Sequence, residues 1–246
     1  MTYILRFFKI IFTLYAGAFF ILTFFIFVPC YFFIFTFYSD KKSPHKAHRL
    51  SQTWAKTLFT FFLIRAKVIN KDFIDPKQTY VFVANHQSQL DIPAYALSCK
   101  NSLRFLAKIE LTKIPLLGYV VRKLYISVDR KNKEARIKSI ENMKDSLREG
   151  ISVFICPEGT RNRTNQPLLD FHDGAFRLAI DSQLPLAVLT LTGAEKLSNP
   201  LKPLELSPGI IYCTWSKPII TSGMTQEDLP KLKEATRNLM LEILRK

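Results

Sequence analysis

The sequence predicts an α/β protein with a central, mostly parallel sheet flanked by helices, preceded by an N-terminal membrane-anchoring helix or helical hairpin. Short apolar runs alternate with helical patterns from residue 46 onward, the order typical of a parallel sheet. No residue between positions 10 and 39 is charged. Two polar motifs follow predicted strands, where α/β proteins place their functional sites.

The uncharged run contains ten of the 21 phenylalanines. At about 1.5 Å per residue, a straight helix over this run would exceed the roughly 30 Å hydrocarbon core of a bilayer. Pro29 is expected to kink or end such a helix. A single tilted, kinked transmembrane helix and a helical hairpin dipping into one leaflet both fit. The run is too long for a signal peptide, so we expect residues 1–45 to be a membrane anchor and residues 46–246 to be the main domain.

The formal net charge of +15 favours an anionic partner. Beside an apolar anchor, an anionic membrane surface is the more economical partner. More basic residues follow the anchor than precede it, which by the positive-inside rule places the domain in the cytoplasm, on the inner (cytoplasmic) membrane. The alternative from another class is a basic, membrane-tethered nucleic-acid-binding protein. No recognised nucleic-acid motif supports it, so no nucleic acid is expected.

Neither a metal nor a cofactor is predicted. The cysteines are far apart and form no Cys-x-x-Cys pair, and the histidines form no zinc pattern. The chain has no glycine-rich phosphate loop, no dinucleotide fingerprint and no Gly-x-Ser-x-Gly nucleophile elbow.

The elements are expected in alternating order after a polar break at residues 39–44. An amphipathic helix starts at Lys46, and it either packs on the domain or lies on the bilayer. Strands are expected over Tyr80–Ala84, Leu103–Ala107, Tyr125–Val128, Ile151–Cys156, Leu186–Leu191 and Ile210–Trp215. Further helices are expected over Lys133–Arg148, Gly174–Asp181 and Glu227–Leu244.

The first polar motif contains His-x4-Asp, formed by His86 and Asp91. These side chains can meet if His86 ends a strand and Asp91 lies one helical turn further on. Asp91 would then bind one ring nitrogen and fix the tautomer, so that the other nitrogen could accept a proton from a substrate hydroxyl. The alternative is a capping aspartate beside an unrelated surface histidine.

The second motif runs from Pro157 to Arg161. Gly159 lets backbone N–H groups approach an anion closely, and Arg161 offers a fork of donors to phosphate. Glu158 could pair with Arg161 or bind an acceptor hydroxyl. The alternative is a β-turn closed by a salt bridge.

These residues resemble the glycerolipid acyltransferases typified by 1-acylglycerol-3-phosphate acyltransferase. The resemblance covers roughly residues 80–195 and keeps the order of four motifs. They are Asn85-His86-x4-Asp91; Lys108–Leu111 with Pro115, Gly118 and Asp129-Arg130; Pro157–Arg161; and Leu184–Leu186. Departures include Cys156 in place of a phenylalanine, and His172 where a lysine is familiar. The missing lysine leaves the acceptor head group open.

The resemblance implies a glycerolipid-acyltransferase-like fold and the direct transfer of an acyl group from a thioester to a glycerolipid hydroxyl. His86 would be the general base and Asp91 its orienting partner. Cations would bind the acceptor phosphate or developing negative charge, Glu158 would help place the acceptor, and Gly159 would give backbone access. The implied substrate-binding residues are Lys108, Arg130, Glu158, Gly159, Thr160 and Arg161.

The implied reaction forms phosphatidic acid from the sn-2 hydroxyl of 1-acylglycerol-3-phosphate. Another lysophospholipid or a lyso-aminolipid is the alternative acceptor. The donor is acyl-CoA or acyl-ACP (acyl carrier protein), which is a co-substrate rather than a cofactor. The sequence leaves the choice of donor, the acyl-chain length and the oligomeric state open.

Overall fold

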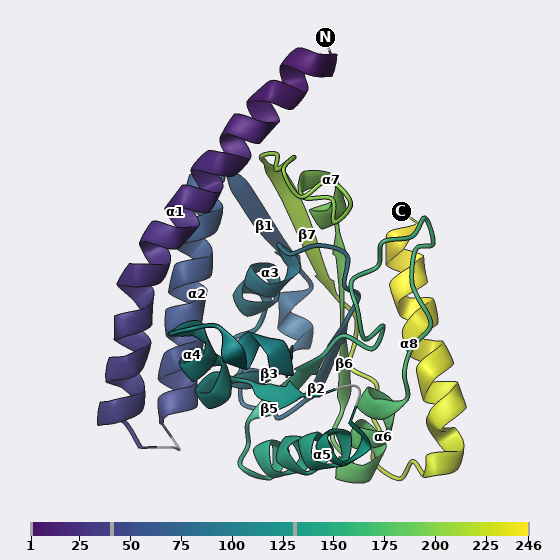
Figure 1. The fold of residues 1–246 in the computed structure, drawn as a ribbon. Helices are drawn as coiled ribbons and strands as arrows, with labels where there is room; N and C mark the ends of the chain where they lie inside the picture. Colours follow the sequence, from purple (N-terminus) through teal and green to yellow (C-terminus); the bar gives the residue numbers. More distant parts are fainter. Residues whose placement is uncertain (1, 40–41, 130–131, 246) are drawn as a thin grey trace.

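A computed structural model describes residues 2–39, 42–129 and 132–245. Its centre is a seven-stranded sheet in the order β1-β7-β6-β2-β5-β3-β4, within the described ranges (Figure 1). The strands are β1 (Ile64–Ile69), β2 (Val81–Ala84), β3 (Leu103–Lys108), β4 (Ile126–Val128), β5 (Ser152–Ile155), β6 (Leu186–Thr192) and β7 (Gly209–Trp215).

The sheet is mostly parallel, as predicted. Only the pairing of β6 with β7 is antiparallel; all other neighbouring strands in the described chain run parallel. The expected strands are present with shifts of one residue or so at their ends. Strand β1 was not predicted from the sequence. It pairs with β7 and forms one edge of the sheet.

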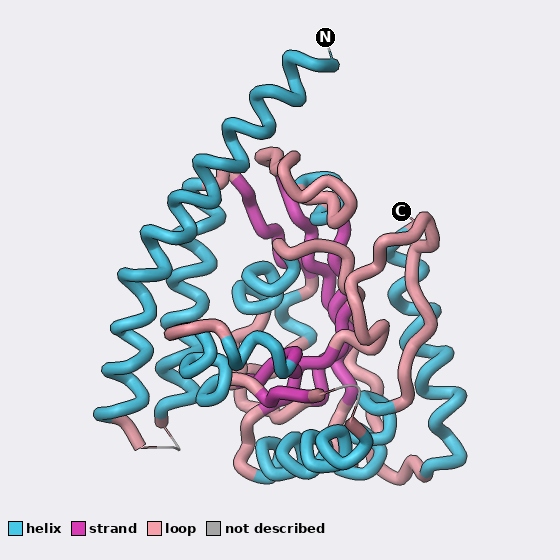
Figure 2. Tube along the Cα trace, in the orientation of Figure 1, coloured by secondary structure: helices cyan, strands magenta, loops and turns pink. Residues whose placement is uncertain are grey.

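Helices cover both faces of the sheet (Figures 1 and 2). They are α1 (Thr2–Phe37), α2 (Ser43–Phe61), α3 (Asp91–Ser98), α4 (Leu117–Leu124), α5 (Lys133–Arg148), α6 (Gly174–Ser182), α7 (Ala194–Leu197) and α8 (Leu229–Leu244). Short 3-10 helices are η1 (Lys71–Phe73), η2 (Ile109–Lys113) and η3 (Gln226–Asp228). The sequence analysis did not predict α3, α4 or α7.

Two apolar cores lie on opposite faces of the sheet because successive strand residues point to opposite sides. In β2, Phe82 and Ala84 join the core that packs against α2 and α3. Val81 and Val83 join the core formed with α5, α6 and α8. This double covering explains why the central strands are apolar without alternation.

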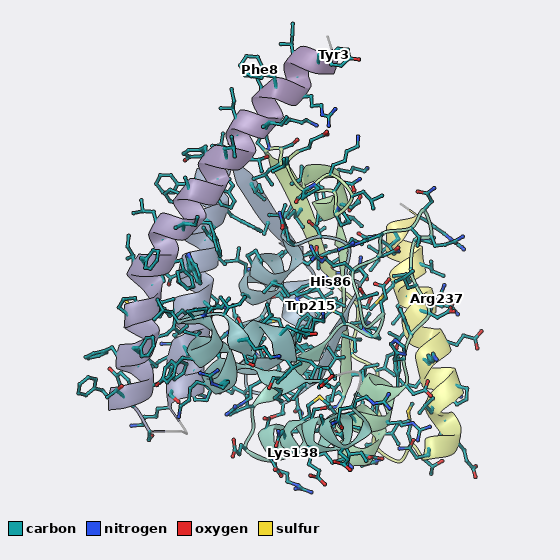
Figure 3. All side chains as sticks on the ribbon, in the orientation of Figure 1. Tyr3, Phe8, His86, Lys138, Trp215 and Arg237 are labelled. Carbon is teal, nitrogen blue, oxygen red and sulfur yellow. The ribbon has the colours of Figure 1, made fainter. Side chains whose placement is uncertain are left out.

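The apolar N-terminal run forms one helix, α1, and not a hairpin of its own. Pro29 lies inside α1, so it does not end the helix as one expectation had it. Of the helices that the structure describes, this one is long and apolar enough to cross a membrane, over Tyr3–Phe37. Most of its apolar side chains are exposed, Phe8 and Tyr3 among them (Figure 3). Such a surface is stable against lipid rather than water, so α1 associates the protein with a membrane.

Helix α2 returns alongside α1, and the two form a helical hairpin (Figure 1). Trp54 of α2 stacks on Phe20 and Phe27 of α1, with ring centroids 5.5 and 5.6 Å apart. Its indole N–H donates to Thr23 Oγ1 at 3.0 Å. Because α2 also contacts α3, β1 and β3, the interpretation of this amphipathic helix as packed on the domain is confirmed. The boundary predicted after residue 45 falls in its first turn.

Candidate active site

The two polar motifs lie at the ends of adjacent parallel strands, β2 and β5. The His86 backbone N–H donates to Glu158 Oε1 at 2.8 Å, and the Asn162 N–H donates to the His86 carbonyl at 2.7 Å. Figure 3 shows His86 near the middle of the molecule. The two loops that carry the motifs are therefore hydrogen-bonded to each other at the carboxyl ends of their strands, although they are about 70 residues apart in the sequence.

Asp91 holds His86 by a direct hydrogen bond. His86 Nδ1 lies 2.8 Å from Asp91 Oδ2, and the same oxygen accepts the backbone N–H groups of Gln87 and Ser88 at 2.7 and 2.8 Å. Asp91 is fully buried at the start of α3, whereas the His86 side chain is 18% exposed. Because a carboxylate only accepts, Nδ1 carries the proton and Nε2 keeps a free lone pair.

Asn85 fixes the chain just before His86. Its side-chain amide donates to the Leu191 carbonyl at 2.9 Å and accepts the Leu191 N–H at 2.8 Å, which ties the end of β2 to β6. The Tyr95 hydroxyl donates to the Asn85 carbonyl. Burial raises the pKa of Tyr95 well above its ordinary value, so this donor stays protonated. The sequence analysis gave neither residue a role, and no local signal marks Tyr95.

Glu158 faces inward. Its side chain is buried, and its Oε2 accepts the Leu169 N–H at 2.8 Å while Oε1 accepts from His86. Burial raises the pKa of Glu158, and the two backbone hydrogen bonds oppose that shift. The Glu158 carboxylate thus joins the loop after β5 to the backbone at His86 and at Leu169.

Gly159 adopts a left-handed backbone conformation, with φ of 69°. A Cβ at this position would lie 2.7 Å from His172 Cδ2 and 2.9 Å from Nε2. The exposed His172 ring therefore covers the space that a side chain at residue 159 would fill. The requirement for glycine is thus both conformational and steric.

Gly159→Ala is expected to lower both stability and acyl-transfer activity. The left-handed conformation alone costs an alanine about 1–2 kcal/mol, and the methyl group must also displace His172. Thermal unfolding and initial rates check this. Adding His172→Ala should relieve the clash but leave the backbone strain, so the double variant should recover only partly. Wild-type behaviour of Gly159→Ala would contradict the assigned constraint.

The predicted cations differ in their surroundings. Arg161 is half-buried and makes no hydrogen bond or ion pair with the part of the chain that the structure describes. Lys108 is exposed at the end of β3 and pairs with Glu110 at 3.2 Å. A hydrogen bond from its own backbone N–H, and then this pairing, lower the pKa of Glu110. Thr160 is exposed beside Arg161, and Arg130 lies outside the described residues.

No group of three or more histidine, cysteine, aspartate or glutamate side chains that could hold a metal ion occurs in residues 2–39, 42–129 and 132–245.

An apolar cavity of about 510 Å³ adjoins the His86 loop. Gln89 and Leu90 of that loop line it, together with parts of α1, α2, α3, β3 and α4. The volume falls within the range of roughly 300–1,000 Å³ typical of small-molecule sites. The apolar lining suits a hydrocarbon chain, and Gln89 and Leu90 bring the cavity wall to within three or four residues of His86 in the chain.

Comparisons with known proteins agree with this geometry. A family model described as "Acyltransferase" matches residues 65–192. The chain is 31% identical over 202 residues to 1-acyl-sn-glycerol-3-phosphate acyltransferase alpha of Mus musculus, covering 81% of this chain and 70% of that protein. It is 29% identical over 194 residues to 1-acyl-sn-glycerol-3-phosphate acyltransferase of Saccharomyces cerevisiae, covering 73% of this chain and 59% of that one.

The fold is that of a solved relative. The crystal structure of the 1-acyl-sn-glycerophosphate (LPA) acyltransferase PlsC from Thermotoga maritima superposes with a TM-score of 0.79 at 22% identity, covering 100% of this chain and 97% of that one. The chain belongs to the acyltransferase family.

Proposed function

We propose that the protein transfers an acyl group from an acyl thioester to the sn-2 hydroxyl of 1-acylglycerol-3-phosphate, giving phosphatidic acid. One observation carries the proposal: His86 is bound through Nδ1 to a buried aspartate, which leaves Nε2 free to act as a base, and the loop that follows His86 lines an apolar cavity. The relatives named as 1-acyl-sn-glycerol-3-phosphate acyltransferases support the choice of acceptor.

The reaction needs one proton shuttle and no covalent acyl-enzyme. His86 Nε2 takes the hydroxyl proton while the hydroxyl oxygen bonds to the thioester carbonyl carbon. Asp91 stabilises the imidazolium that forms. The tetrahedral intermediate then expels the thiolate, and the imidazolium returns its proton to the sulfur. The C–S bond breaks, the C–O ester bond forms, and the free thiol leaves with the carrier.

The positively charged side chains would bind the acceptor phosphate and the developing oxyanion. Arg161 is the strongest candidate, because it lies on the loop bonded to His86 and has no partner in the described chain. Lys108, Arg130 and Thr160 complete the proposed set, with backbone access at Gly159. Glu158 acts through His86: with both oxygens bound to backbone N–H groups, it positions the base rather than the acceptor.

Arg161→Ala is expected to raise the KM for the acceptor by about 10- to 100-fold, since a charge-assisted hydrogen bond contributes roughly 1.5–3 kcal/mol. The matched control is Arg163→Ala, which removes an exposed arginine from the same loop and should change the acceptor KM little. Steady-state kinetics at varied acceptor concentration measures the acceptor KM of both variants. An acceptor KM and kcat that both stay at wild-type values in Arg161→Ala would remove this residue from the site.

The cavity is proposed to hold the acyl chain. Gly17 of α1 lines it, and a Cβ built there meets no atom within 4 Å. Gly17→Leu should therefore fill part of the cavity without a backbone clash, and it should strengthen the helix by up to roughly 1 kcal/mol.

We expect Gly17→Leu to lower kcat/KM for long-chain thioesters while sparing short-chain ones. Gly174→Leu is the matched control, because Gly174 is equally open but lies on α6, away from the cavity. Kinetics with a series of acyl-CoA lengths measures the effect. The same chain-length profile in wild type and Gly17→Leu would place the acyl chain elsewhere.

The α1–α2 hairpin is the proposed membrane attachment of the protein. Along α1, Thr13 Oγ1 donates to the Leu204 carbonyl at 2.9 Å and accepts the Leu206 N–H at 2.9 Å, while Phe32 stacks on Tyr119 at 4.2 Å. Because α1 is bound to the domain at both of these points, it cannot span the bilayer while the whole domain lies beyond one end of the helix. Residues 1–45 would anchor the protein in one leaflet of the inner membrane, with the catalytic domain, residues 46–246, facing the cytoplasm.

Acceptor competition tests the proposed substrate. A purified preparation is given one labelled long-chain acyl thioester and an equimolar mixture of lysophosphatidate, other lysophospholipids and a lyso-aminolipid. Labelled phosphatidate should be the main product. Consumption of another lysolipid in preference to lysophosphatidate would establish the alternative acceptor. Salt-sensitive DNA binding without any transfer would favour the nucleic-acid-binding alternative.

A further inference from the structure

Three exposed aliphatic side chains stand together between β3 and α4. Leu111, Ile114 and Leu116 are 38%, 44% and 46% exposed, within a segment of nine residues from Lys108 to Leu116. We call these three residues the apolar ridge. Single exposed aliphatic residues are ordinary on protein surfaces, but three within six residues of the chain make a candidate interaction site.

The segment that carries the ridge is held in place by its own hydrogen bonds. Arg122 of α4 donates to the Thr112 carbonyl at 2.7 Å, and the Gly118 N–H donates to the Ile114 carbonyl at 2.7 Å. A Cβ at Gly118 would lie 2.1 Å from the Thr112 carbonyl oxygen, so only glycine permits this close approach. The backbone that carries the ridge is therefore held in one conformation.

Leu116 adds backbone strain to apolar exposure. Its φ is 63° and its ψ is −54°, outside the regions that leucine favours. A non-glycine residue with a left-handed φ costs about 1–2 kcal/mol. Strain of this kind persists where the surroundings impose it, commonly at functional sites. Folding alone gives no reason to hold a strained leucine outward into water.

The ridge continues the lipid-facing surface of α1. Leu117, the next residue, lines the apolar cavity together with Val120 of α4. Tyr119, between them, stacks on Phe32 of α1. Figure 1 shows α4 near the end of the hairpin where α1 finishes and α2 begins, and α4 contacts α1. The ridge is thus followed directly in the chain by residues that contact the cavity and α1.

Basic side chains surround the ridge. Lys113 lies within the segment, while Arg122 and Lys123 end α4, and all three are exposed. Lys108 starts the segment and pairs with the single acidic residue in it, Glu110. An apolar group bordered by cations complements an anionic bilayer, whose head groups attract the cations while its acyl region accepts the aliphatic tips.

We propose that the apolar ridge is a second membrane-contact element, separate from the N-terminal anchor, which inserts into the interface of an anionic bilayer. Together with α1 it gives the domain two points of attachment. Two points fix the rotation of the domain about α1, and they hold the cavity beside the lipid that supplies the acceptor. A second copy of the chain is the competing occupant, because it would also cover aliphatic side chains.

Site-specific fluorescence tests the proposal on the full chain. Ile114→Cys is labelled with an environment-sensitive nitrobenzoxadiazole probe in a Cys30→Ser background, since Cys30 is the exposed native thiol. The matched control is Ile220→Cys, because Ile220 is 65% exposed after β7 and lies outside the ridge. Both proteins are reconstituted into phosphatidylglycerol-containing vesicles with and without doxyl-labelled lipids.

The probe at residue 114 should shift its emission to the blue and be quenched by the doxyl lipids, and the probe at residue 220 should show neither effect. Equal emission at both positions would overturn the proposal. A blue shift at residue 114 that doxyl lipids do not quench and that fades on dilution would also overturn it, because a second copy would then cover the ridge.

An activity comparison adds a readout, and it rests on the proposed acyl transfer whereas the fluorescence does not. Ile114→Asp should lower the rate severalfold on acceptor presented in anionic vesicles, and leave the rate on a monomeric short-chain acceptor unchanged. Ile220→Asp should leave both rates unchanged. An equal loss with both presentations in Ile114→Asp would assign the ridge to catalysis instead of membrane contact.

Discussion

His86→Ala is expected to lower kcat for acyl transfer by about 10²- to 10⁴-fold, the usual contribution of a positioned general base. The fold should survive, because the side chain is partly exposed and makes one hydrogen bond, to Asp91. Asp91 keeps the two backbone donors from Gln87 and Ser88. Initial rates at saturating donor and acceptor, with a thermal unfolding curve for each protein, measure both effects.

The matched control is His172→Ala. His172 is exposed and covers Gly159, but it does not contact Asp91, so its loss should leave most of the activity. A folded His86→Ala protein with wild-type kcat would show that another group removes the proton.

Asp91→Asn should lower kcat nearly as much as His86→Ala. The asparagine oxygen can still accept from the backbone, which preserves the loop. Its amide group can instead donate to Nδ1 and leave the ring proton on Nε2, where the free lone pair is needed. The KM for the acceptor should change far less than kcat, because the residue acts through His86 and not on the substrate.

Asp91→Ala separates this effect from a structural one. It leaves the buried N–H groups of Gln87 and Ser88 without an acceptor, at a cost of roughly 1–3 kcal/mol each. It should therefore lose stability as well as activity, whereas Asp91→Asn should lose mainly activity. Equal stability of both variants, or full activity of Asp91→Asn, would contradict the role assigned to this carboxylate.

The sequence predicted the parts of the fold that are encoded locally. The apolar central strands, the charged helix α5 and the position of both motifs after strands are all readable from periodicity. Strand β1 alternates apolar and basic residues, which is the pattern of a half-buried strand. It was missed because only two residues separate it from α2, so that no polar turn marks where the helix ends and the strand begins. The antiparallel direction of β7 depends on its partner β6, and no local pattern specifies it.

In the candidate site, too, the local features could be predicted and those that depend on distant segments could not. The pairing of His86 with Asp91 could be predicted, because only four residues lie between them and a strand end followed by a helix start brings them together. The inward orientation of Glu158 could not be predicted, because it depends on a hydrogen bond from another segment. The Leu169 N–H that it accepts lies on the far side of a loop. Tyr95 supports the site from the fifth residue of α3, a helix that was not predicted.

The most direct measurement is phosphatidate formation by the purified wild-type protein in detergent micelles, given lysophosphatidate and a long-chain acyl thioester carried by either coenzyme A or acyl carrier protein. The proposed function predicts labelled phosphatidate with at least one carrier, with one thiol released per ester formed. A folded protein that forms no phosphatidate with either carrier, while it acylates a different lysolipid, would contradict the proposed acceptor.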